Sequence, residues 1–294
     1  MSGRGFAQHA VPTCLLAGGV GLGLLVWRWR SQVSDAPPRP SRRLPTCRAP
    51  WLTAGDEERP RVVLVCTGSV ASVKVPELVV ALRQKLDAQV AVLLTEAAEA
   101  MTSAKIAGRY APESFTKWEE LQQSVDVHVL RDLDEWEGYE DVSSDLVVHI
   151  ELRKWADLAV VAPCSANTLA KMALGLCDNL ATSFLRAWDP EKPLVLAPAM
   201  NTIMWEHPST AKHLKTLEDW FGCWVVPPVS KRLACGDVGR GALASVSDIM
   251  ERIAKCCEGM EGRRNSSAVG AWQRRGFQEW QKSPWLKEWQ PRDA

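Results

Sequence analysis

The feature that most constrains the fold of this chain is a series of short, uninterrupted apolar runs rich in β-branched residues. The runs cover residues 62–66, 90–94, 158–162, 194–197 and 224–226. A strand with one face in water alternates apolar and polar residues, whereas these runs are continuous. They therefore predict the strands of a parallel sheet that is covered on both faces.

The stretches between these runs have helical spacing. Val75, Leu78, Val79, Leu82 and Leu86 recur at intervals of three and four residues, which predicts a crossover helix between the first two strands. The same pattern predicts helices over residues 169–176, 208–220 and 247–257. We therefore expect a three-layer α/β fold with a parallel sheet, in a single domain over residues 61–258.

The two ends of the chain differ in composition from this domain. Residues 11–27 are apolar and just long enough to span a bilayer, so a membrane anchor and an upstream extension without a membrane role remain alternatives. Arginines directly after this stretch would keep the domain in the cytoplasm if it inserted. Prolines and arginines in residues 31–60 predict a linker. Residues 259–294 predict a disordered, tryptophan-rich basic tail, whose tryptophans could instead dock on a partner or a membrane.

Charge and cysteine content narrow the class of protein. Lysine plus arginine and aspartate plus glutamate both number 35, so no overall positive field favours a nucleic-acid partner. The nine cysteines are odd in number and contain no Cys-x-x-Cys pair. We therefore expect free thiols in the reducing cytoplasm and no metal ion.

Two turns follow predicted strands and open predicted helices. Residues 67–71 read Thr-Gly-Ser-Val-Ala, and residues 163–168 read Pro-Cys-Ser-Ala-Asn-Thr. Hydroxyl groups and the free N–H groups of a helix N-terminus attract phosphate, although either turn alone could be an ordinary connection with Ser165 as a helix cap. Two such turns at the carboxyl edge of one sheet favour a bound mononucleotide.

Three further segments complete a set that is recognisable as a whole. They are Val-His-Ile at 148–150, Pro-Ala-Met-Asn at 198–201 and Ala-Cys-Gly-Asp at 234–237. In order and spacing the five segments resemble the homo-oligomeric flavin-containing cysteine decarboxylases. The resemblance extends over residues 61–253 and is strengthened by segments at 134–136, 151–157, 177–180, 186–189 and 204–208.

The resemblance implies a Rossmann-like (flavodoxin-like) fold, FMN as the cofactor and a homotrimer with the flavin at the subunit interface. The implied small-molecule substrate is phosphopantothenoylcysteine, which would be decarboxylated to phosphopantetheine in coenzyme A biosynthesis. Loss of a carboxylate from a saturated carbon needs an electron sink, and a C=S bond formed by hydride removal from the CH2–SH end would be one.

Three residues receive catalytic roles from the resemblance. His149 would take the thiol proton, Asn201 would hold the substrate carboxylate, and Cys235 would protonate the enethiolate product. From the residues alone, a structural histidine, a turn asparagine and a bystander cysteine remain alternatives. Glycines at 236, 239 and 241 suit a flap that closes over the substrate.

The resemblance also implies binding residues. The expected flavin contacts are Gly68, Ser69, Val70, Thr95, Met101, Ser165, Ala166, Asn167, Thr168 and Ala199, with Met101 where relatives tend to carry an aromatic residue. Arg232 and Ala234 would join Asn201 in contacting the substrate.

The main alternative function is a regulatory flavoprotein that inhibits a protein phosphatase. The chain keeps all three catalytic positions and has basic ends, which favours the enzyme. A peptide cysteine decarboxylase and a flavin prenyltransferase are two further alternatives, and the match at 134–136 and 149–157 argues against both.

Overall fold

The computed structural model describes residues 50–53, 59–137, 139–140, 145–232 and 238–264, all of which lie within the unit Leu44–Ala294. The apolar stretch 11–27, most of the predicted linker and the tryptophan-rich tail from residue 265 lie outside the described residues. Among the helices that the structure describes, none has the length and apolar character needed to cross a membrane.

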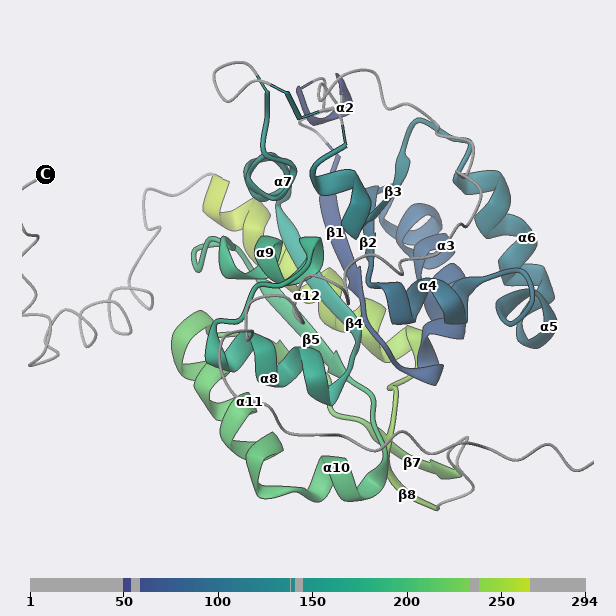
Figure 1. Cartoon of the computed structure of the whole chain (residues 1–294), viewed down its shortest axis with the longest axis vertical. Helices are drawn as coiled ribbons and strands as arrows, with labels where there is room; N and C mark the ends of the chain where they lie inside the picture. The colour runs from purple at the N-terminus through teal and green to yellow at the C-terminus, as the bar shows by residue number, and fades with distance from the viewer. Residues whose placement is uncertain (1–49, 54–58, 138, 141–144, 233–237, 265–294) are drawn as a thin grey trace, which may run out of the picture. The chain divides into compact units, whose positions relative to one another are not determined.

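Six parallel strands form the central sheet (Figure 1), in the order β3-β2-β1-β4-β5-β6. Their bounds are β1 Arg61–Cys66, β2 Gln89–Leu94, β3 Val127–Arg131, β4 Leu158–Cys164, β5 Leu194–Pro198 and β6 Trp224–Val225. This is the strand order of Rossmann sheets, and it differs from the order 2-1-3-4-5 of flavodoxin within the same doubly wound class. The predicted parallel, Rossmann-like α/β fold is therefore confirmed.

Helices cover both faces of the sheet, which explains why the strands lack alternation. Val62 and Leu64 of β1 face one core and Val63 and Val65 the other, and all four are fully buried. The first core is closed by α3 Val75–Leu86, α6 Pro112–Leu121 and α12 Val246–Arg264. The second is closed by α7 Val148–Trp155, α8 Ala166–Leu174, α9 Leu180–Arg186 and α11 Pro208–Phe221.

Shorter elements complete the described part of the fold. They are α2 Pro50–Thr53, η1 Val70–Lys74, α4 Glu96–Thr102, α5 Ala107–Tyr110, η2 Asp132–Glu135, α10 Thr202–Glu206, and the strands β7 Val229–Arg232 and β8 Val238–Ala242. β7 and β8 form an antiparallel pair that lies apart from the main sheet, beside α10 (Figure 1).

All five strand predictions are confirmed, but the sequence missed three strands and displaced some helix ends. β3 is an edge strand in which only Val127 and Leu130 are buried, so its sequence lacks a continuous apolar run. The segment around Lys231 belongs to the separate β7–β8 pair, for which the sequence contains no continuous apolar run. α8 begins at Ala166 because Ser165 caps it, and α12 continues past Cys257 to Arg264.

Part of the predicted linker packs on the domain, which corrects that prediction for residues 50–53 and 59–60. The Trp51 ring stacks on His128 at a centroid distance of 3.9 Å and meets Trp155 edge-on. Arg59 forms an ion pair with Asp126 at 3.0 Å. Composition predicted a linker because prolines and arginines dominate, whereas Trp51 and Arg59 each contact the folded domain.

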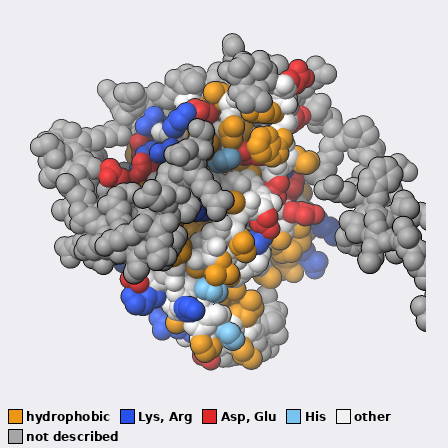
Figure 2. All heavy atoms as spheres, turned by 60° about the vertical axis from the view of Figure 1, so that its left-hand side comes forward, with side chains coloured by type: hydrophobic (Ala, Val, Ile, Leu, Met, Phe, Trp, Pro, Cys, Tyr) orange, Lys and Arg blue, Asp and Glu red, His pale blue; other side chains and the backbone are white. Residues whose placement is uncertain are grey.

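The described surface mixes side chains of both charge signs with apolar ones (Figure 2). Large apolar side chains are exposed at the carboxyl edge of the sheet. Leu133 and Trp136 beside η2 are 84% and 60% exposed, and Ile203 of α10 is 74% exposed.

Candidate active site

The turns after β1 and β4 lie side by side at the point where the strand order of the sheet reverses. From β1 the chain builds β2 and β3 on one side, then crosses to place β4 on the other side. Thr67, after β1, connects the two turns, since its hydroxyl donates to the Pro163 carbonyl at 2.9 Å and accepts from the Ser165 N–H at 2.8 Å. Crevices at such reversal points are the usual ligand sites of open α/β sheets.

A cavity of about 670 Å³ lies at this edge, within the range of about 300 to 1,000 Å³ that is typical of ligand and cofactor sites. It is lined by the turns after β1 and β4, the segment after β5, the β7–β8 pair and the start of α12. Among the predicted site residues, those that line it are Gly68, Ser69, Val70, Ser165, Ala166, Asn167, Ala199 and Asn201. The structure thus brings together three segments that are far apart in the sequence.

The two turns present capped helix N-termini to this cavity. The Ser69 hydroxyl accepts from the Ala71 N–H at 3.3 Å, and the Ser165 hydroxyl accepts from the Thr168 N–H at 3.2 Å. The capping role that the sequence left open for Ser165 is therefore present, and Ser165 also lines the cavity. Hydroxyls and helix N-termini in this arrangement fit a phosphate group.

The segment that carries Asn201 is held against the β7–β8 pair. The Met200 N–H donates to the Gly241 carbonyl at 2.9 Å, and a side chain at Gly241 would collide with the carbonyl of Met200. Asn201 caps α10, with its side-chain oxygen accepting from the Ile203 N–H at 2.9 Å. Gly241, one of the glycines predicted for a flap, therefore allows close backbone approach to the segment that carries Asn201.

Some predicted residues are placed elsewhere. His149, Thr95, Met101 and Thr168 are all described by the structure, and none of them lines this cavity. His149 lies in the first turn of α7, with Nδ1 2.6 Å from Oε1 of Glu135.

Thr95 and Thr168 have local partners. Thr95 caps α4, and the hydroxyl of the buried Thr168 accepts a hydrogen bond from the Ser165 hydroxyl. Arg232 is the last residue of β7, and Ala234 and Cys235 lie outside the described residues.

The sequence missed part of the lining. Lys74, which pairs with Glu77 at 2.7 Å, contributes a charge, as does Lys231, and Met200 and Met204 contribute apolar surface. Residues 242–246 close the cavity from the far end of the hairpin. No local pattern distinguishes residues 242–246, because they reach the cavity only through the packing of β8 and α12.

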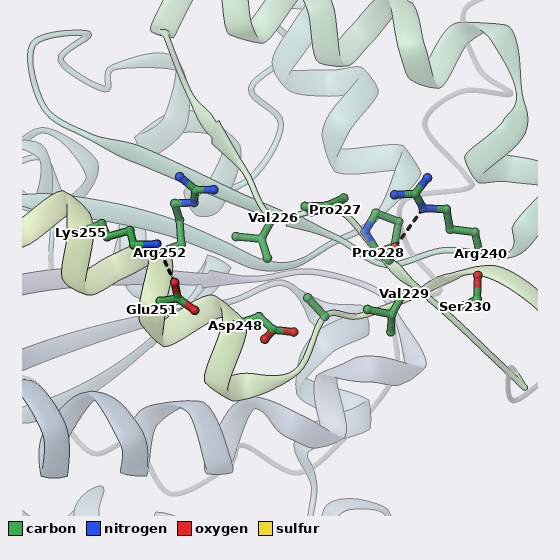
Figure 3. A pocket seen from close by; sticks show the side chains of 11 residues that line it. Val226, Pro227, Pro228, Val229, Ser230, Arg240, Asp248, Glu251, Arg252 and Lys255 are labelled. Atoms are coloured by element: carbon green, nitrogen blue, oxygen red, sulfur yellow. Dashed lines mark hydrogen bonds and ion pairs between the residues drawn. The ribbon is translucent and has the colours of Figure 1, made fainter.

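A second cavity, of about 550 Å³, lies behind the hairpin (Figure 3). Four of its charged side chains contact other parts of the protein. Lys255 pairs with Glu251, Arg240 donates from Nε to the Pro228 carbonyl at 3.2 Å, and Arg252 lies over the Trp224 ring. No predicted site residue that the structure describes lines it, so the candidate active site is the first cavity.

The fold and this site define a mononucleotide-binding α/β protein, with phosphate-binding turns at a strand reversal and an adjoining cavity with apolar walls. The family model described as Flavoprotein matches residues 52–258. The chain therefore belongs to the flavoprotein family.

Several similar proteins are named as phosphopantothenoylcysteine decarboxylases. The mouse (Mus musculus) enzyme is 44% identical over 209 residues, covering 71% of this chain and 93% of the relative. The enzyme of rice (Oryza sativa subsp. japonica) is 44% identical, covering 72% of this chain and 87% of the relative.

Solved structures agree with these relatives. A PPC decarboxylase in which a cysteine is replaced by serine, complexed with pantothenoylaminoethenethiol, is 41% identical with a TM-score of 0.59, covering 68% of this chain and 99% of that one. The FMN binding protein AtHal3 is also 41% identical, with a TM-score of 0.57, covering 68% of this chain and 98% of that one.

Proposed function

We propose that this chain is an FMN-dependent decarboxylase that converts phosphopantothenoylcysteine to phosphopantetheine. The observation that carries the proposal is the convergence of three strand-end segments on one cavity, in a chain that is 44% identical to decarboxylases with this substrate in their names. The structure of a relative named as an FMN binding protein supports the choice of flavin.

The residues around the cavity fit FMN. Ser69, Ser165 and Asn167 would hold the phosphate at the two helix N-termini, and Val70 and Ala199 offer apolar surface for the ring. When bound, FMN would supply a reversible hydride acceptor, and removal of hydride from the substrate would form the C=S bond that serves as the electron sink.

The three predicted roles stay a proposal for this chain. His149 would remove the substrate thiol proton, Asn201 would hold the carboxylate through its amide N–H, and Cys235 would return a proton to the enethiolate. Asn201 lines the cavity, in keeping with its role. The Cys235 role is supported by the relative that holds an ethenethiol when a cysteine is replaced by serine.

We also propose a homotrimer in the cytoplasm. His149 does not line the cavity that Asn201 lines, so within one chain the proposed base and the proposed carboxylate holder are separated. A neighbouring copy would bring its α7 to the cavity and cover the exposed Leu133 and Trp136. Six described cysteines are free thiols, which supports a reducing location.

The full chain with FMN should release carbon dioxide from phosphopantothenoylcysteine and show a flavin absorption band. Cys235→Ser should decarboxylate once and stop, with the flavin left reduced, because the enethiolate is not protonated. Absence of carbon dioxide release from the flavin-loaded wild-type protein would refute the proposed function, and continuous turnover by Cys235→Ser would refute the role of the thiol.

A further inference from the structure

The closest described partner of His149 is a carboxylate that the sequence motifs left without a role. Oε1 of Glu135 lies 2.6 Å from Nδ1 of His149, a short distance for a hydrogen bond between these groups. The Glu135 side chain is 5% exposed and the His149 side chain 21%. The second oxygen of Glu135, Oε2, is also buried and has no hydrogen-bond partner among the described residues.

The burial pattern around Glu135 is the reverse of what hydrophobicity favours. The acid points inward, while its apolar neighbours Leu133 and Trp136 are mostly exposed. A buried carboxylate costs free energy unless it is paired with a donor or a positive charge. In η2, Leu133 is therefore left exposed, while the Glu135 carboxylate is buried against the imidazole of His149.

Neighbouring elements hold η2 firmly. The Arg131 N–H donates to Asp134 at 2.6 Å, and the Leu180 N–H at the start of α9 donates to Asp132 at 3.2 Å. The Arg131 guanidinium also bonds Glu99 of α4 at 2.8 Å. Glu135 and His149 thus come from two different elements, η2 and α7. The turn η2 and the residue before it are hydrogen-bonded to both α4 and α9.

We propose that Glu135 is the positioning residue of His149, an inference that rests on the proposed decarboxylase function. By accepting the Nδ1–H, Glu135 fixes the tautomer in which Nε2 carries the free lone pair. Nε2 then takes the proton as the substrate S–H bond breaks, and the electron pair stays on sulfur. The carboxylate stabilises the resulting imidazolium.

The first test replaces the charge and keeps the shape. Glu135→Gln should lower kcat on the order of 100-fold, because the amide does not stabilise the imidazolium, while KM and FMN content stay within about twofold of wild type. Glu135→Asp keeps the charge and should recover part of the loss. Glu137→Gln makes the same change at an exposed acid two residues away and should behave as wild type.

These outcomes judge the proposal directly. A Glu135→Gln protein with the kcat of the Glu137→Gln control overturns it, as does a variant in which only KM rises. If neither the wild type nor the Glu137→Gln control releases carbon dioxide, the decarboxylase function is refuted. The pairing of Glu135 with His149 can then still be tested by NMR, without turnover.

The second test reads the tautomer without any turnover. In wild-type protein labelled with ¹⁵N-histidine, the resonances that disappear in His149→Gln belong to His149. They should show the proton on Nδ1, and this pattern should be lost in Glu135→Gln. A wild-type His149 with its proton on Nε2 overturns the proposal, whether or not the glutamine variant folds.

Discussion

At the scale of single residues, the turn after β1 depends on Gly68. A Cβ atom at this position would lie 2.8 Å from the Cβ of Ala97 in α4, closer than nonbonded carbons approach. Gly68 therefore lets the turn that lines the cavity pack directly on α4. The resemblance assigned this glycine to the flavin, and the structure adds a packing reason for it.

Gly68→Ala should lower the free energy of unfolding by about 1–3 kcal/mol and reduce the flavin bound per subunit, because the turn must move away from α4. Urea denaturation and the visible absorption of the purified protein measure the two effects. Gly108→Ala is the matched control, since its added Cβ would lie 3.4 Å from the Phe115 ring. Equal denaturation midpoints for the two variants would contradict this explanation.

At the scale of secondary-structure elements, ion pairs stabilise the β3 edge of the sheet. Asp126, just before β3, accepts from Arg59 at 3.0 Å and from Arg83 of α3 at 2.7 Å. Burial alone would raise the pKa of Asp126, but the hydrogen bond from Arg59 and the charges of Arg83 and Arg59 hold it below its usual value. This contact joins the segment before β1, the helix α3 and the edge strand.

Asp126→Asn should therefore lower the free energy of unfolding by about 1–3 kcal/mol at pH 7. A carboxyl with a lowered folded-state pKa stabilises the fold above its unfolded pKa, and this contribution is lost as the pH falls through the folded value. The difference between wild type and variant should thus shrink below about pH 4.

Urea denaturation at several pH values tests this pH dependence. Asp219→Asn, which removes an exposed pair with Lys215, should change the free energy of unfolding by less than about 0.5 kcal/mol. If the difference in free energy of unfolding between wild type and Asp126→Asn grows as the pH falls, the ion pairs of Asp126 do not stabilise the fold in this way.

At the scale of the whole molecule, the proposed site is divided between copies of the chain. His149→Asn and Cys235→Ser should each be inactive alone. Co-expressed, they should recover about one quarter of wild-type turnover, because random assortment pairs an intact His149 with an intact Cys235 from a neighbouring copy at that frequency. Turnover per flavin in the purified mixture measures the recovery.

Asn201→Ala mixed with Cys235→Ser provides the control for this experiment. If both residues serve a site from the same chain, no assortment restores them together, and the mixture should stay inactive. Turnover in this control mixture would contradict a site shared in this way. So would the absence of turnover in the mixture of His149→Asn with Cys235→Ser.

Much of the fold follows from local sequence patterns. A strand covered on both faces must be apolar, so the four buried strands β1, β2, β4 and β5 are visible as runs, and the helices between them as periodic stretches. The strand-end turns are equally local, because a cap such as Ser165 needs only residues within the next turn of helix. These patterns determined the class of fold and the edge of the sheet where the candidate site lies.

Only the tertiary structure decided which side chains meet. The half-exposed β3, the docking of Trp51 on His128 and the burial of Glu135 beside His149 depend on partners 14 or more residues away. No local pattern encodes such pairs, since their free energy comes from contacts that form only when the elements pack together. For the same reason the sequence determined that His149 and Asn201 are present, and only the packing showed that one chain leaves His149 outside the cavity that Asn201 lines.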